Sequence, residues 1–178
     1  MIALVPVDGI DTKVLNFLKD SLKVRFEREI IIDSGVNPPT HAYNPKRSQY
    51  YATPIVKFIS NSVKGYEKVL GVIDFDLWVP GLNFIFGEAE GIGGRVGIIS
   101  LTRLRQEFYG LPPDTNLFYE RALKEAVHEL GHLYGLVHCE NSKCVMHFSN
   151  SLRDTDYKDS HFCSECMEKL KQLCFKRR

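Results

Sequence analysis

The sequence predicts an α+β fold with a mixed, twisted sheet of about four to five strands, a long helix and a small C-terminal lobe. Three observations support this prediction. The chain opens with an apolar run, a helical repeat of apolar residues and a second apolar run, which together indicate a strand–helix–strand unit. A longer helical repeat spans residues 116–136. All five cysteines follow that repeat, where the composition changes.

The strand–helix–strand unit occupies the N-terminus. Residues 2–7 form an apolar run rich in β-branched side chains, which predicts a buried strand. Asp11 or Thr12 is expected to cap the following helix, because apolar residues then recur at helical spacing at positions 14, 15, 18 and 22. Residues 26–32 predict the second strand. The two strands are expected to share a sheet, with the helix as their crossover connection.

A loop and a second helix are expected next. Residues 34–51 contain several prolines and polar side chains, which predict a surface loop. Thr53 and Pro54 then fit an N-cap followed by a proline at the first helical position, with the helix continuing to about Val63.

Two more strands and the long helix complete the expected layers. The strands are predicted over residues 68–75 and 95–101. The glycine-rich stretch of residues 80–94 lacks the spacing of a phosphate-binding loop, so its glycines are expected to allow turns and bulges. The long helix, residues 116–136, has a stripe of apolar side chains for the core: Leu123, Val127, Leu130 and Tyr134.

The chain of 178 residues is long enough for one domain with a substantial core. We expect a single domain over residues 1–178, made of a sheet-and-helix lobe (1–137) and a C-terminal lobe (138–178). The net charge of +1 gives no electrostatic reason to expect binding to nucleic acid or to a membrane. The N-terminus lacks the features of a secretory signal, and no apolar run approaches a membrane span. The expected location is therefore the cytoplasm, where thiols stay reduced.

The long helix carries the strongest chemical signal. His128 and His132 are four residues apart, so on a helix they lie on one face and can share a tetrahedral metal, most often zinc. Glu129 lies beside the first ligand, where a carboxylate can reach a water on the metal. A continuous helix would carry His138 about 15 Å from His128. Gly135 removes this difficulty, because glycine accepts the left-handed conformation that ends a helix and lets the chain return.

A second metal site is indicated by the cysteines. Cys139 and Cys144 form one close pair, and Cys163 and Cys166 form another, which is typical of a closed four-cysteine zinc site that stabilises a small lobe. The alternative is two disulfides, which would need an oxidising compartment. Cys174 is left over and is expected to be a buried or unbound thiol. Since Cys139 directly follows His138, the two metal sites must be neighbours.

With a methionine two residues after the second cysteine, the pattern H-E-x-x-H-x-x-G-x-x-H-C-x4-C-x-M resembles the archaemetzincins, zinc metalloproteases of the metzincin clan. The resemblance extends over nearly the whole chain. It includes three further stretches, at residues 43–50, 83–90 and 148–163. The resemblance implies a metzincin-like zincin fold with a long active-site helix and an antiparallel edge strand, around residues 95–101, that borders the cleft.

The resemblance also implies roles for individual residues. Glu129 would be the general base, and Met146 would form a Met-turn beneath the metal without binding it. Two zinc ions are implied, one catalytic and one structural. The catalytic zinc would be held by His128, His132 and His138, and the structural zinc by Cys139, Cys144, Cys163 and Cys166.

The predicted function is hydrolysis of peptide bonds by a zinc-activated water. The expected partner is a peptide or protein substrate, and the enzyme is expected to be a monomer. The alternative is a zinc-ribbon-like binding or regulatory module with little or no peptidase activity. A non-proteolytic zinc hydrolase is a weaker third interpretation. Two zincs per chain would favour the protease. An aminopeptidase would need an acidic partner for the substrate's amino group, for which Glu88, Glu90 and Asp156 are candidates.

One position departs from a pattern found in some metzincins. Phe148 stands two residues after the methionine, where those enzymes carry a tyrosine whose hydroxyl reaches the zinc. The sequence does not choose among Tyr157, Lys158 and His147 as a replacement donor. By default, His147 is expected to be a solvated surface histidine, as are the remaining histidines, His41 and His161.

Overall fold

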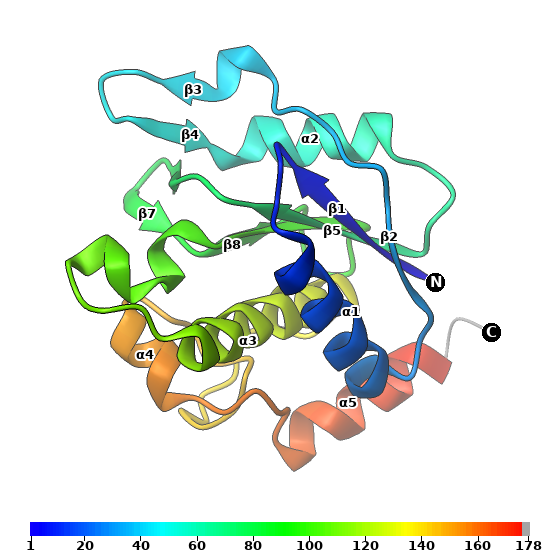
Figure 1. Ribbon diagram of the computed structural model, residues 1–178. Helices are drawn as coiled ribbons and strands as arrows, with labels where there is room; N and C mark the ends of the chain where they lie inside the picture. Colours follow the sequence, from blue (N-terminus) through cyan, green and yellow to red (C-terminus); the bar gives the residue numbers. More distant parts are fainter. Residues whose placement is uncertain (176–178) are drawn as a thin grey trace.

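A five-stranded mixed sheet forms the centre of the computed structural model, which describes residues 1–175 (Figure 1). The strand order is β2, β1, β5, β9, β8. The first four strands run parallel, and β8 is the antiparallel edge strand. Their bounds are β1 (Ile2–Val7), β2 (Ile30–Ile32), β5 (Lys68–Ile73), β8 (Gly87–Ala89) and β9 (Val96–Ser100). The expected mixed sheet with an antiparallel edge strand is therefore confirmed.

The identity of the edge strand corrects the sequence analysis. The strand expected to border the cleft, at residues 95–101, is β9, and it lies inside the sheet between β5 and β8. The edge strand comes instead from the glycine-rich stretch that was expected to form only turns and bulges. The strand has a glycine at position 87 because there is no room for a side chain. A Cβ at this position would lie 2.6 Å from Oε1 of Glu129 and 2.8 Å from the Ile98 carbonyl oxygen.

A smaller second sheet has the order β3, β4, β6, β7. Its strands are β3 (Tyr43–Asn44), β4 (Gln49–Tyr51), β6 (Leu77–Val79) and β7 (Leu82–Ile85). The prediction of a simple loop over residues 34–51 was therefore wrong. Side-chain contacts hold these short strands. The ring centroids of Tyr50 and Phe75 are 4.0 Å apart. The buried Gln49 amide donates to Asp76 and to the Asn83 carbonyl. Such contacts leave no periodic pattern in the sequence.

Within residues 1–175, five α-helices surround the sheets. They are α1 (Thr12–Phe26), α2 (Ala52–Ser62), α3 (Thr115–Leu133), α4 (Leu152–Tyr157) and α5 (Ser164–Phe175). Three short 3₁₀ helices are η1 (Thr40–Ala42), η2 (Thr102–Leu104) and η3 (Gln106–Tyr109).

The helix starts agree only in part with the prediction. Asp11 caps α1 as expected, with its carboxylate accepting from the Lys13 amide at 2.9 Å. Because α1 continues to Phe26, β2 is shorter than the strand predicted at residues 26–32. Thr53 does not cap α2, because the helix begins one residue earlier, at Ala52, with Tyr51 at the N-cap position. The Thr53 hydroxyl instead donates to Glu88 at 2.8 Å.

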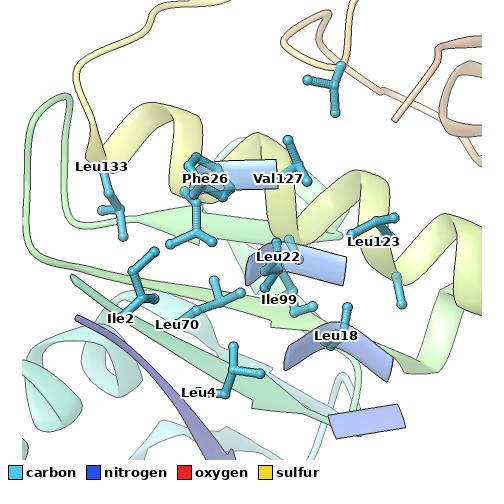
Figure 2. Close-up of a cluster of buried hydrophobic side chains, with 14 of the residues drawn as sticks. Ile2, Leu4, Leu18, Leu22, Phe26, Leu70, Ile99, Leu123, Val127 and Leu133 are labelled. Carbon is cyan, nitrogen blue, oxygen red and sulfur yellow. The ribbon is translucent and has the colours of Figure 1, made fainter. Parts of the chain in front are cut away.

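The hydrophobic core lies on both faces of the larger sheet. On one face, Leu18 and Leu22 of α1 and Leu123 and Val127 of α3 pack against strand residues such as Leu70 (Figure 2). The other face is covered by α2, which lies on the opposite side from α1 and α3 (Figure 1). Successive side chains of β1 alternate between the two faces, as a buried strand requires. The predicted core stripe of the long helix is buried throughout.

The region after α3 has little regular structure. Residues 134–151 contain no helix or strand, and α4 and α5 are the regular elements that follow them in the described chain. Leu170 of α5 joins the core shared by α1 and α3. None of the described helices is both long and apolar enough to cross a membrane.

Candidate active site

The long helix α3 brings His128 and His132 to one buried face. Asp114 caps the start of the helix by accepting from the Leu117 amide at 2.9 Å. The helix ends at Leu133, three residues before the predicted end. There the Gly135 amide donates to the His132 carbonyl at 3.0 Å, and the Leu136 amide donates to the Gly131 carbonyl at 2.9 Å.

This pair of hydrogen bonds is a Schellman motif, with Gly135 in the left-handed region at φ 108°. The motif turns the chain back on itself just after the helix. His138 thereby returns to the first two histidines, as its spacing from Gly135 predicted. One ring nitrogen from each of His128, His132 and His138 lies within 4.8 Å of the others.

The buried histidines are oriented for a cation. Nδ1 of His128 donates to the Val145 carbonyl, and Nδ1 of His132 donates to the Leu136 carbonyl, both at 2.8 Å. These bonds fix the tautomer, so the two Nε2 atoms carry lone pairs, and they face each other at 3.1 Å. Two acceptors at this distance repel unless a cation lies beside them. The donor set therefore fits a metal such as zinc.

His138 differs from the other two histidines. Its side chain is exposed, and the described residues make no hydrogen bond to its ring. The ring is placed by packing instead, with its centroid 5.1 Å from that of Phe148. Phe148 is itself partly exposed. The position that carries tyrosine in some metzincins is therefore occupied here by a ring that packs on a histidine.

Electrostatics at the three histidines favour the neutral imidazole. Burial lowers the pKa of His128 well below its ordinary value, and the nearby Lys158 and His132 lower it further. Burial is also the main cause of the lowered pKa of His132, and partial desolvation beside its neighbours lowers the pKa of the more exposed His138. Neutral imidazole is the form that binds a metal.

Glu129 lies between the histidines and the edge strand. Its side chain is buried, and it packs against Gly87 of β8, where there is no room for a Cβ atom. Burial raises the pKa of Glu129 well above its ordinary value, and Glu125, one helical turn earlier, raises it further. A carboxyl group in such surroundings has the affinity for protons that a general base needs.

The second cluster contains the four predicted cysteines. The sulfur atoms of Cys139, Cys144, Cys163 and Cys166 all lie within 4.8 Å of one another. Sγ of Cys139 and Sγ of Cys163 are 3.8 Å apart, and the Cys163 amide donates to Sγ of Cys144 at 3.3 Å. None of the five described cysteines forms a disulfide. Four converging thiols fit a closed tetrahedral zinc site.

Met146 joins the two clusters. Its side chain is fully buried against Gly131 of α3, where an added Cβ would overlap Sδ of the methionine. Its backbone carbonyl accepts from the Cys139 amide at 3.0 Å. The methionine therefore packs under the histidines, and its main chain holds the residue that follows His138.

A cleft of about 540 Å³ lies over the histidines and Glu129. One wall is formed by β7, Phe86 and β8, and another by residues 148–150. The rest of the lining consists of Val79, Gly91, Ile92, Glu125 and Val137. A second hollow, of about 550 Å³, lies beside His138 and the cysteines, but Glu129 is not among its lining residues.

The candidate oxyanion donors lie elsewhere. Tyr157 is exposed, with the Lys143 ammonium 3.7 Å from its ring centroid. Lys158 is completely buried and pairs with Glu125, whose carboxylate is 3.2 Å from Nζ. His147 is half-buried, and its Nδ1 donates to the Cys139 carbonyl at 2.9 Å. The expectation of a solvated His147 was therefore wrong. None of the three is among the described residues that line the cleft.

The other candidates are distributed as follows. Glu88 lines the cleft, and one of its oxygens accepts from Thr53. Glu90 is bound to the Ser60 hydroxyl, and Asp156 forms a bidentate ion pair with Arg121. His41 and His161 are exposed.

Sequence reasoning missed Glu125 and Gly87, and it named Lys158 only as a candidate oxyanion donor, not as the partner of Glu125. The spacing of Glu125, four residues before Glu129, places both carboxylates on one face of the helix and was the available signal for it. Lys158 and Gly87 reach the site only through the tertiary fold, so no local pattern identifies them.

The sequence is similar to that of known peptidases over nearly its whole length. The sequence matches peptidase family M54 over residues 10–172. An archaemetzincin of Methanocaldococcus jannaschii is 46% identical over 169 residues, which is 95% of this chain and 92% of the relative. An archaemetzincin of Pyrococcus furiosus is 46% identical over 180 residues, covering 97% of this chain and 93% of the relative.

Solved structures agree with the sequence matches. The crystal structure of archaemetzincin from Methanopyrus kandleri superposes with a TM-score of 0.85 at 35% identity, covering 98% of this chain and 94% of that one. The archaemetzincin of Archaeoglobus fulgidus gives a TM-score of 0.82 at 37% identity, with coverages of 95% and 99%. The chain therefore belongs to peptidase family M54, the archaemetzincins, and is a zinc metallopeptidase.

Proposed function

We propose that the chain uses two zinc ions, one for catalysis and one for structure. In this proposal His128, His132 and His138 hold the catalytic ion. Cys139, Cys144, Cys163 and Cys166 hold the structural ion. Residues 138–175 thus complete the same catalytic domain as the sheet and α3.

The observation that carries the proposal is the convergence of the three imidazoles beside Glu129, in a cleft bounded by the edge strand. When bound, zinc would supply a Lewis acid that polarises a carbonyl group and lowers the pKa of water. Glu129 would take the proton of the attacking water and return it to the departing amine. Gly87 leaves the space in which the carboxylate lies for this task.

The edge strand offers a place for the peptide. The Ser100 amide donates to the Phe86 carbonyl at 2.7 Å, and the Glu90 amide donates to the Val96 carbonyl at 2.8 Å. Because hydrogen-bonded pairs alternate along antiparallel strands, the backbone groups of Gly87 and Ala89 point away from β9. A substrate in extended conformation would bind there by main-chain hydrogen bonds.

The alternative of a zinc-ribbon-like binding module has no observation in its favour. The cysteine cluster adjoins the histidine cluster through consecutive residues, so it does not form a separate module. The carboxylate of Glu129 also has a place in the cleft that such a module would not need.

The test is a peptide-library cleavage assay of the zinc-loaded protein, with and without chelator. Glu129→Gln should retain two zincs per chain and lose about 100- to 10,000-fold in kcat, because the amide cannot accept the water proton. Glu120→Gln, at an exposed position of the same helix, is the matched control and should cleave like the wild type. Wild-type turnover by Glu129→Gln would remove Glu129 from the mechanism. A wild-type protein whose cleavage is unaffected by chelator would contradict the proposal as a whole.

A further inference from the structure

The segment Val145-Met146-His147 contacts the surroundings of both metal clusters. The Val145 carbonyl accepts from the His128 ring at 2.8 Å. The Met146 carbonyl accepts from the Cys139 amide at 3.0 Å. His147 uses its side chain, with Nδ1 donating to the Cys139 carbonyl at 2.9 Å. Three consecutive residues therefore hold the main chain or the ring of candidate metal ligands.

His138 is the ligand most in need of such support. The rings of His128 and His132 are each oriented by a backbone carbonyl, whereas the described residues offer the His138 ring no hydrogen bond. The position of His138 therefore depends on its packing and on its own backbone. The next residue, Cys139, is held at its amide by the Met146 carbonyl and at its carbonyl by the His147 ring.

His147 is itself held firmly. Its amide donates to the Cys144 carbonyl at 2.9 Å, and its carbonyl accepts from the Lys158 ammonium at 3.4 Å. Lys158 is completely buried and is fixed in turn by the Glu125 carboxylate at 3.2 Å. His147 thus contacts the buried Lys158–Glu125 pair through its backbone carbonyl and the chain beside the third ligand through its imidazole.

We propose that His147 is a positioning residue whose ring N–H fixes the Cys139 carbonyl and thereby sets His138 at the catalytic metal. This inference rests on the proposed ligand set. His147 is absent from the described cleft lining, so it acts through His138 and does not touch the substrate. Residues that orient metal ligands typically contribute 10- to 100-fold in metal affinity, roughly.

Two substitutions separate the hydrogen bond from simple packing. His147→Asn keeps an N–H at the same distance from the backbone as Nδ1. His147→Gln moves that N–H one bond further out, to the place of Nε2. We expect His147→Gln to bind the catalytic zinc about 10- to 100-fold more weakly, with a lower kcat and little change in KM. His147→Asn should restore most of the zinc affinity.

The readouts are zinc affinity, measured by competition with a chelator, and the absorption spectrum of the cobalt-substituted protein. The cobalt–thiolate band should be unchanged in both variants, while the spectrum of the histidine-bound cobalt should change in His147→Gln alone. His161→Gln removes an exposed histidine of the same region and serves as the control. If His147→Gln does not fold, His147→Ser carries the test, because its side chain is too short to reach the carbonyl.

Wild-type zinc affinity and kcat in His147→Gln would overturn the inference. Equal losses in His147→Asn and His147→Gln would also overturn it, since they would indicate a role in packing. The proposed function is judged separately, because it depends on zinc-dependent cleavage by the wild-type protein and on Glu129→Gln.

Discussion

The two candidate metal clusters differ in how the chain supports them. Two of the three histidines lie on α3, a helix packed in the core, and their rings are fixed by backbone carbonyls. Of the four cysteines, Cys139 and Cys144 lie in the irregular stretch after α3, whereas Cys163 directly precedes α5 and Cys166 lies in its first turn. The histidines are open to the cleft, whereas the cysteines offer a metal a complete set of four ligands.

This difference suggests that the histidine cluster serves activity and the cysteine cluster serves stability. A three-ligand site leaves a position for chemistry, and a four-ligand site closes around its metal and contributes folding energy. The fold would present most of the histidine cluster without a metal, because α3 forms on packing and capping. With the proposed structural zinc, the region around the cysteines would depend on that metal for much of its structure.

The largest expected effect comes from the cysteine cluster. Cys144→Ser should lose the structural zinc and destabilise residues 138–175, since structural zinc contributes on the order of 10 kcal/mol in small zinc peptides. Cleavage should be lost as well, because Cys139 is bonded directly to His138. His138→Ala should abolish cleavage with only a small change in the free energy of unfolding, because this side chain is exposed. Zinc content, thermal unfolding and peptide cleavage measure the contrast. Retained cleavage by Cys144→Ser would mean that the clusters are independent.

An intermediate effect is expected at the buried ion pair behind the histidine cluster. Lys158→Met leaves the Glu125 carboxylate buried without its charge partner and should lower the free energy of unfolding by about 3–5 kcal/mol. The double variant Glu125→Met/Lys158→Met should recover most of this loss, because both charges are gone. Lys169→Met breaks an exposed pair with Glu165 and should leave the free energy of unfolding nearly unchanged, because solvent screens such a pair. Denaturant titration measures all three, and a double variant as unstable as Lys158→Met would contradict the explanation.

The smallest expected effect concerns the start of α4, beside the cleft wall. Asp154 completes a capping box with Ser151, whose hydroxyl lowers the pKa of the Asp154 carboxyl. A lowered folded-state pKa adds stability above the ordinary carboxyl pKa, and this stability is lost as the pH falls through the folded-state value. Asp154→Ala should therefore cost about 1 kcal/mol at pH 7 and progressively less in acid. The difference in unfolding free energy between the two proteins, followed with pH, tests this; a constant difference would rule out the ionised cap.

The same contrast explains what could be predicted from the sequence. The histidine pair follows from helical spacing, and the return of His138 follows from the one glycine that ends the helix. The cysteine pairs are close in sequence and are therefore also visible. The position of the edge strand could not be predicted, because Gly87 is explained by contact with a carboxylate more than 40 residues away. Lys158 and His147 are of residue types that are usually found at the surface, and only the fold shows their partners.

The bond between His138 and Cys139 has a consequence for engineering. Adjacent α-carbons are about 3.8 Å apart, so there is no linker between the last residue of the histidine cluster and the first residue of the cysteine cluster. The C-terminal region therefore cannot be exchanged as a cassette, and an insertion at this junction would shift both ligand sets at once. Design can alter the cleft walls away from Gly87 and Phe148 separately, whereas a change at this junction affects both candidate metal clusters together.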